Sequence, residues 1–333
     1  MMNQRASAVA SVLLLIAVAL ALLGVGVGST GFESVLHATD DPVALQILWD
    51  IRLPRTLGAW VAGALLGLAG AVAQGLFRNP LADPYLLGSA SGASLGVALS
   101  LVLFGVSPFA TQWLMRLGLT AGAFVGAVAG VLLTLLLAQG VQHTLRLLLA
   151  GVIVGVVLGA AKELIMLARP DFLQSMQSFM LGSTGYVGWS ACTIMSGTWL
   201  VCMAAAWTLS PVLDGLALGE ATAASLGLPL ERLRRALVAV LALATGTAVA
   251  QTGMVAFVGL AAPHLVRSVV KTSHGRLVFL SSLMGGALLM AADILARWVI
   301  APQELPVGVL TAVLGGGYLL LLMHRRVAKG GSL

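Results

Sequence analysis

Charged side chains are scarce in this sequence: of its 333 residues, 18 are Lys or Arg and 12 are Asp or Glu, 9% of the chain. Soluble domains carry about a quarter charged residues, so a chain with this little charge and 59% hydrophobic residues is not an ordinary soluble domain. The mean hydropathy of +1.02 points the same way. These values predict an all-α polytopic membrane protein.

Cysteine and lysine are also rare. Their positions exclude a disulfide within one apolar segment and a P-loop ATPase site. Cys192 and Cys202 lie ten residues apart in one apolar segment, about 15 Å along a helix, too far for a disulfide within it. The only lysines are Lys162, Lys271 and Lys329, and none stands in a GxxxxGK[ST] phosphate-binding loop. The chain therefore has no P-loop ATPase site, and ATP-driven work would need a separate subunit.

Apolar segments of bilayer length are abundant. At about 20 residues per crossing, 333 residues can hold about ten transmembrane helices in a single domain spanning 1–333. A more polar segment at 29–50 is expected to lie outside, between the first two crossings. The expected crossings are 8–28, 56–77, 88–106, 117–138, 145–167, 190–209, 236–251, 255–270, 277–298 and 306–323.

Charge placement orients these crossings. With both termini inside, the inner ends carry twelve Lys or Arg against four acids, and the outer ends carry six against eight. By the positive-inside rule this arrangement predicts a multi-pass membrane protein with both termini in the cytoplasm. Crossings two to five and seven to ten begin on opposite sides, which permits an inverted repeat, although their sequences show no convincing self-similarity.

Two connecting segments are unusual. Residues 169–189, on the outside, are long enough for a short helix and a Gly-rich corner, which suits either a gate or a packed outer loop. Residues 210–235 form the longest cytoplasmic loop. Within it, 218–227 is expected to form a short helix that ends at Gly227, ahead of Pro229.

Several short motifs, in order along the chain, closely resemble the permease subunits of the ATP-binding-cassette (ABC) importers for iron–siderophores, haem and vitamin B12. No single tetrapeptide is decisive, but their order and spacing from Arg52 to Met323 are specific. The motifs are Arg52-Leu-Pro-Arg55, Gln74-Gly75, Asn79-Pro-Leu-Ala-Asp-Pro84, Leu87-Gly88, Leu218-Gly-Glu220, Phe257-Val-Gly-Leu260, Pro263-His264 and Glu304-Leu-Pro-Val-Gly308.

This resemblance implies a type II ABC importer permease fold, a location in the bacterial inner (cytoplasmic) membrane and a set of partners. They are a second copy of the chain, two cytoplasmic ATPase subunits that use ATP, and a periplasmic substrate-binding protein. It implies neither catalytic residues nor a permanently bound cofactor. One motif departs from the family: the last glycine pair is usually followed by a proline and an aromatic residue, whereas this chain has Gly315-Gly-Gly-Tyr318.

The resemblance also assigns site residues. Arg52, Arg55 and Arg297 suit interfacial snorkelling as well as a basic docking patch, and the resemblance favours docking of the binding protein. His264, in Pro263-His264, is expected to cap or contact a loop near the ATPase side. The residues expected to couple to the ATPase are Leu218, Gly219, Glu220, Ala223, Ser225, Leu226 and Gly227. The residues expected at the gate or pathway are Met166, Gln177, Met180, Gly182, Ser183 and Thr184.

The cargo is expected to be a large iron chelate, with haem first and siderophore or vitamin B12 as alternatives. The preference for haem rests on an apolar, methionine-rich stretch from the fifth crossing to Trp189. His37 and Met176 could approach an iron porphyrin, but fixed ligation and a metal site are not expected, because methionine usually packs and a conduit must release its cargo. The rival classes are an ion-coupled carrier and a membrane enzyme; neither a deep carboxylate relay nor a His/Asp/Glu cluster at one depth is evident.

Overall fold

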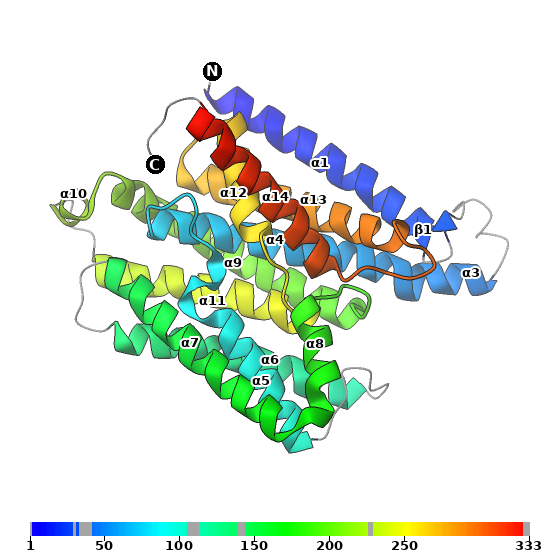
Figure 1. The fold of residues 1–333 in the computed structure, drawn as a ribbon. Coiled ribbons are helices and arrows are strands. Elements are labelled where there is room, and N and C mark those ends of the chain that lie inside the picture. Colours follow the sequence, from blue (N-terminus) through cyan, green and yellow to red (C-terminus); the bar gives the residue numbers. More distant parts are fainter. Residues whose placement is uncertain are drawn as a thin grey trace.

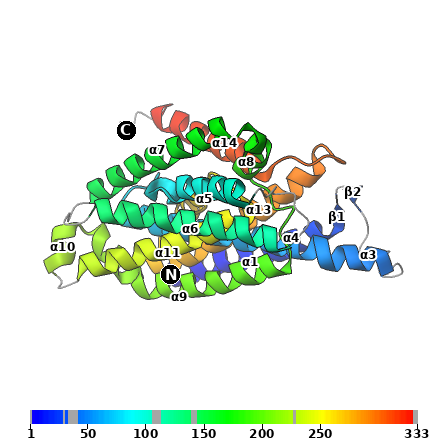
Figure 2. The same cartoon turned by 90° about the horizontal axis from the view of Figure 1, so that it is seen from below.

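The computed structural model describes residues 2–28, 31–32, 42–104, 113–138, 144–225 and 229–328. These residues form an elongated helical bundle with α10 (Glu220–Ser225) at one end and α3 (Pro42–Ile47) at the other (Figures 1 and 2). We refer to these as the α10 end and the α3 end. Helix α1 (Met2–Gly26) begins, and α14 (Val307–Ala328) finishes, toward the α10 end.

Each of the ten expected crossings corresponds to a helix, which confirms the all-α polytopic prediction. Seven helical stretches in the described residues are long and apolar enough to cross a membrane, while α5 and the apolar part of α14 are shorter. Besides α1 and α14, these helices are α4 (Leu53–Leu76), α5 (Ser89–Phe104), α6 (Trp113–Leu137), α7 (Thr144–Ala168), α9 (Trp189–Ala217), α11 (Leu230–Thr252), α12 (Val258–Val269) and α13 (His274–Trp298).

The second crossing begins earlier than predicted. Helix α3, the π-helical turn η1 (Leu48–Arg52) and α4 form one helical stretch, Pro42–Leu76, so residues 42–50 of the segment expected to lie outside are helical and continuous with the second crossing. Pro42 suits a first helical position, where its missing N–H costs nothing. Pro54 would crowd the carbonyl four residues earlier in a regular helix, and the wider turn just before it relieves that contact. Beside this stretch, β1 (Val27–Gly28) pairs antiparallel with β2 (Gly31–Phe32).

Helix α4 runs through the middle of the bundle and is buried along almost its whole length. Its glycines allow the backbones of α12 and α13 to touch it. A Cβ on Gly70 would lie 1.7 Å from the carbonyl oxygen of Gly259, and one on Gly67 would lie 2.1 Å from that of Ser281. Close backbone approach of this kind is how small residues hold membrane helices together.

Two helices begin inside the bundle. Helix α5 follows the 3-10 turn η2 (Pro84–Leu87), and Gly88 between them faces Val154, ten residues into α7 and therefore about 15 Å from its start. Helix α12 follows a non-helical stretch, 253–257, and spans only 12 residues. The two interruptions meet, because the Tyr85 hydroxyl donates to the Val255 carbonyl oxygen at 2.9 Å.

These short helices are the third and eighth of the ten predicted crossings. They therefore occupy equivalent places in the two groups of four whose opposite starting sides permit an inverted repeat. Interrupted helices in equivalent positions of two halves are characteristic of transporters, where the non-helical backbone lines or borders the path.

A short helix lies between the fifth and sixth crossings, where the sequence predicted one. A 3-10 turn, η3 (Pro170–Phe172), leads into α8 (Leu173–Leu181), which packs across the bundle near the α3 end (Figure 1). Gly182 ends α8 with φ +69°, a conformation that favours glycine.

Candidate functional site

Helix α10 protrudes from one end of the bundle as a six-residue helix. Of the residues assigned to coupling, Leu218 is 68% exposed, Gly219 has φ +109° just before the helix, and Ala223 is fully buried. Ser225 lies on the exposed side. The predicted helix is therefore present, with an apolar contact on one side and an exposed leucine at its start. Leu226 and Gly227 lie outside the described residues.

Glu220 fixes α10 to two other elements. Its carboxylate pairs with Arg234 near the start of α11 at 2.8 Å and lies 3.8 Å from Arg78, which follows α4. The Glu220 side chain is 20% exposed and that of Arg234 is 13% exposed, so this pair is shielded better than a surface ion pair. A displacement of α10 would therefore be transmitted directly to the ends of α4 and α11.

Two further polar pairs, neither of which is evident from the sequence, join helices near the α10 end. Asp214 of α9 accepts from the backbone N–H of His274 at 3.0 Å and lies 2.7 Å from the His274 Nδ1 atom, which ties α9 to the start of α13. Gln74 of α4 accepts from Arg267 of α12 and donates to the Leu260 carbonyl oxygen at 3.2 Å. Each residue lies at the polar end of an apolar helix, but hydropathy alone does not identify its partner.

The glycine triplet at the unusual C-terminal motif has a structural explanation. Phe257, ahead of α12, has φ +67°, and its Cβ would lie 2.4 Å from a Cβ on Gly315. The ring of Tyr318 packs edge-on against His264 with centroids 5.9 Å apart. The residues that depart from the family pattern thus pack α14 against α12.

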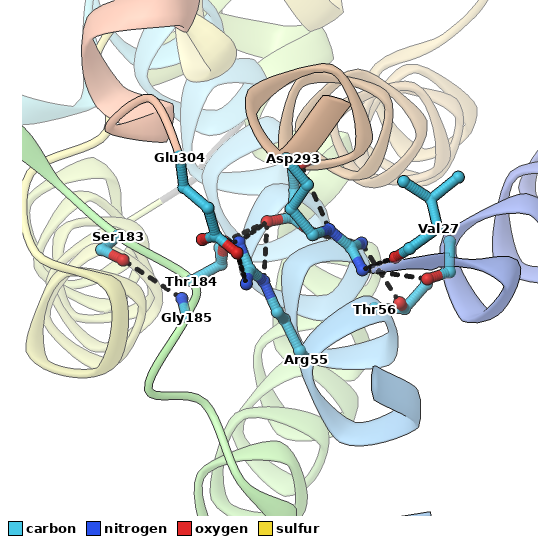
Figure 3. Close-up of polar contacts among 10 residues, drawn as sticks. Val27, Arg55, Thr56, Ser183, Thr184, Gly185, Asp293 and Glu304 are labelled. Atoms are coloured by element: carbon cyan, nitrogen blue, oxygen red, sulfur yellow. Dashed lines mark hydrogen bonds and ion pairs between the residues drawn. The ribbon is translucent and has the colours of Figure 1, made fainter. Parts of the chain in front are cut away.

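At the α3 end, Arg55 is held by two carboxylates (Figure 3). Its Nε and Nη2 atoms donate to Oδ1 of Asp293 at 3.1 and 3.0 Å, and Nη1 and Nη2 donate to the two oxygens of Glu304 at 2.9 and 2.8 Å. Thr184 donates to the same Asp293 oxygen. One guanidinium therefore connects α4, α13, the loop after α8 and the loop before α14.

Arg297 completes this group from the other side of Asp293. Its Nη2 atom donates to Asp293 Oδ2 at 2.6 Å, and its Nη1 atom donates to the carbonyl oxygens of Gly24 and Val27, at the end of α1. We call Arg55, Arg297, Asp293, Glu304 and Thr184 the arginine–carboxylate network. Its two cations and two anions balance, which is the condition under which buried charges are tolerated.

This network corrects the geometry expected for two of the three docking arginines. Arg297 is 1% exposed and Arg55 is 9% exposed, so in this conformation they do not form a solvent-facing basic patch. The physical reason is pairing within the chain, because carboxylates from α13 and from the loop before α14 fill the positions that a partner's acids would take. Arg52 is half-buried at the same end.

The loop that leaves α8 is fastened to the end of α11. The Ser183 N–H donates to the Thr252 carbonyl oxygen at 2.8 Å, and the Met254 N–H donates to the Phe179 carbonyl oxygen at 3.0 Å. Gly253 has φ +68°, and a Cβ there would lie 2.5 Å from the Phe179 oxygen. Any movement of α8 therefore involves the interrupted segment before α12.

A cavity of about 660 Å³ opens beside this loop. Of the residues assigned to the gate, Gly182 and Ser183 line it, and Glu304 of the network forms part of its wall. Thr184 is instead fully buried on Asp293, while Gln177 and Met180 are exposed elsewhere on α8. Other lining residues come from the start of α9, the end of α11 and α6.

The methionines near α8 have a packing role in this structure. Met166 and Met176 are 4% and 3% exposed and belong to an apolar cluster with Val97, Leu101 and Val249. The expectation that Met166 lies on a pathway therefore does not fit its position, because its side chain packs between helices rather than along the cavity. His37 lies outside the described residues.

Within the described ranges, no group of three or more His, Cys, Asp or Glu side chains is placed to hold a metal ion. The polar residues that do converge are Asp293, Glu304 and Thr184, none of which the sequence assigned to a common site. The sequence does predict one contact of this group, because Asp293 precedes Arg297 by four residues on one helix, and the structure confirms that ion pair.

Helices interrupted inside a membrane bundle, in equivalent places of two groups of four, are characteristic of transport proteins. Comparison with known sequences gives the family. Residues 13–325 match the model of the FecCD transport family, and the chain belongs to that family. It is thus a permease subunit of an ABC transporter and a multi-pass membrane protein.

Named relatives agree with this assignment. The hemin transport system permease protein HmuU of Yersinia pestis is 37% identical over 309 residues, 91% of each chain. The vitamin B12 import system permease protein BtuC of Salmonella typhimurium is 39% identical over 282 residues, 83% of each chain. A metal-chelate type ABC transporter solved in an inward-facing conformation superimposes with a TM-score of 0.83 at 29% identity, covering 94% of this chain and 97% of that one.

Proposed function

We propose that this permease imports a large iron-containing chelate, with haem as the first candidate, from the periplasm to the cytoplasm. The observation that carries the proposal is the full-length similarity to a hemin permease, which covers 91% of both chains. The lining of the cavity beside α8 is compatible with such a cargo, since apolar residues and uncharged hydroxyls predominate and Glu304 is engaged by Arg55. Vitamin B12 is the second candidate, because BtuC is 39% identical over a shorter region.

The working unit in this proposal contains two copies of the chain, two cytoplasmic ATPase subunits and a periplasmic binding protein. The α10 end faces the cytoplasm, because arginines such as Arg78 and Arg234 gather there as the positive-inside rule requires. The α3 end then faces the periplasm, with both termini cytoplasmic. A second copy has ample apolar surface to contact; α7, for example, exposes Val156, Leu164 and Leu167.

Energy enters at α10 in this mechanism. Leu218 and the exposed side of α10 contact the ATPase, and Glu220 passes the displacement to α4 and α11 through its pairs with Arg78 and Arg234. The interruptions before α5 and α12 allow the middle of the bundle to rearrange without breaking a continuous helix. At the other end, the loop 182–185 and α8 open or close the path.

The binding protein docks at the α3 end, with Arg52 and Arg55 as its basic anchors. Charge complementarity of this kind favours fast encounter and a fixed orientation. Arg297 supports the site from within, since its guanidinium holds Asp293 in place behind Arg55.

One experiment tests cargo and mechanism together. The permease–ATPase complex is reconstituted in nanodiscs, and ATP hydrolysis is measured with the binding protein loaded with haem, vitamin B12 or a ferric siderophore. Haem-loaded protein should stimulate hydrolysis most. Greater stimulation by another ligand would reassign the cargo, and transport by the permease alone under a proton or sodium gradient would instead indicate an ion-coupled carrier.

A further inference from the structure

The two carboxylates on Arg55 differ in how they are held. Asp293 is fully buried and bound by Arg297 and Thr184 as well, whereas the Glu304 side chain is 32% exposed and pairs with Arg55. Glu304 comes from the loop between α13 and α14 rather than from a helix. Glu304 is therefore the partner of Arg55 that can leave while the fold stays intact.

The geometry of the Glu304 contact is that of a recognition site. Both carboxylate oxygens accept from the Nη1 and Nη2 atoms of Arg55, at 2.9 and 2.8 Å (Figure 3). Such a two-bond fork is the arrangement with which arginine recognises a carboxylate from any source. A carboxylate on another protein would form the same pair only by taking the place of Glu304.

The structure also provides for the displaced side chain. Glu304 lines the 660 Å³ cavity beside α8, where Ser183, Gln251 and Thr252 offer polar contacts. Arg55 would keep its two hydrogen bonds to Asp293 during the exchange, so its charge would never be left unpaired in a buried place.

We propose that Glu304 is an internal stand-in for an acidic side chain of the binding protein, and that docking exchanges the one carboxylate for the other on Arg55. This inference rests on the proposed docking of a binding protein at the α3 end. The exchange links docking to the gate, because the released Glu304 enters the cavity lined by Gly182 and Ser183, next to Thr184 on Asp293. In the undocked permease the same contact keeps Arg55 occupied and opposes binding of unrelated acidic proteins.

The test measures the dissociation constant of the fluorescently labelled binding protein for the permease–ATPase complex in nanodiscs. Glu304→Gln removes the competing carboxylate charge with little change in shape, so binding should tighten by about tenfold, the factor expected when one charge-assisted contact no longer has to be displaced. Glu304→Asp keeps the charge but shortens the reach, and binding should tighten by a smaller factor. Glu163→Gln is the matched control, because Glu163 is an exposed, ion-paired glutamate on α7, and it should leave binding unchanged.

The outcomes separate the two proposals. If the wild-type complex binds the protein and neither Glu304→Gln nor Glu304→Asp binds it more tightly, the exchange is wrong while docking stands. If the wild-type complex shows no saturable binding, docking and the exchange are both wrong. Glu304→Asp guards against misfolding of the glutamine variant, since tightening in neither variant overturns the exchange.

Discussion

Arg55 on α4 and Asp293 on α13 lie 238 residues apart in sequence and share two hydrogen bonds, at 3.1 and 3.0 Å, in the buried part of the α3 end. The carboxylate is simultaneously bound by Arg297 and Thr184. Asp293 thus compensates two cations, and its removal would leave Glu304 as the remaining carboxylate of the network for two arginines, of which Arg297 is 1% exposed.

The first prediction follows from this arrangement. Asp293→Asn should destabilise the permease by about 3–5 kcal/mol, because breaking a buried pair leaves uncompensated charge. The melting temperature of the purified protein in detergent reports the loss. Glu163→Gln, which removes an exposed carboxylate, should have almost no effect, and equal melting of the two variants would contradict a stabilising role for Asp293.

A second prediction concerns backbone contact between α4 and α12. Gly70→Ala places a Cβ 1.7 Å from the Gly259 carbonyl oxygen, so the helices must separate, at a cost of about 3 kcal/mol or more. Gly159→Ala on α7 is the control, because a Cβ there meets nothing within 4 Å, and it should change stability by less than about 1 kcal/mol. Thermal unfolding followed by intrinsic fluorescence measures both, and a normal melting temperature for Gly70→Ala would refute this packing.

The sequence predicts the helices of this fold better than the contacts between them. Apolar runs of bilayer length located all ten helices, and turn residues located α8 and α10, because these signals are local. The burial of Arg297 could not be predicted in the same way, since a charge at a helix end suits both snorkelling and pairing. The choice depends on the end of α1 and on Thr56 of α4, which reach Arg297 only in the folded bundle. The helical stretch 42–52 was missed because its acidic and exposed residues resemble those of a loop.

The interruptions of α5 and α12 had partial sequence signals. Pro80 and Pro84 disfavour helical backbone just before the third crossing, and the family motif includes 257–260. Neither signal predicted that the two breaks meet through Tyr85 and Val255, because that contact depends on how the two groups of four helices pack. A hydrogen bond between distant breaks leaves no periodicity in the sequence.

That contact gives a third prediction. Tyr85→Phe leaves the Val255 carbonyl oxygen without this donor and should cost about 1–3 kcal/mol of stability. It should also raise ATP hydrolysis that is not accompanied by transport, because the two interrupted segments would no longer move together. Tyr318→Phe, which keeps the ring against His264, serves as the control. An unchanged ratio of transport to hydrolysis in Tyr85→Phe would exclude this coupling role.

A fourth prediction concerns α10. Glu220→Gln loses the charge that pairs with Arg234 and Arg78, so α10 should transmit ATPase movement poorly and transport should fall by about tenfold. The loss of stability should be about 1 kcal/mol, because the Glu220 side chain keeps partial contact with solvent. Glu231→Gln is the matched control: Glu231 pairs with Arg235 on exposed α11 surface and should leave transport unchanged. Transport and ATP hydrolysis in proteoliposomes measure both. Equal transport by the two variants would show that the Glu220 pairs do not carry the coupling.

The fifth prediction concerns movement of the gate loop, 182–185, measured by fluorescence. Ser183 lines the cavity beside α8 and Glu304, whereas the native thiols of Cys192 and Cys202 are buried, so Ser183→Cys can be labelled selectively with an environment-sensitive fluorophore. Docking of the binding protein should change the emission of this label, because the released Glu304 carboxylate and the loop 182–185 alter its surroundings. In the Glu304→Gln background the change should shrink, since no charge enters the cavity. Leu218→Cys, exposed at the α10 end, is the control and should respond to the ATPase but not to the binding protein alone. If the label at residue 183 responds equally in both backgrounds, the gate moves on docking without the release of Glu304.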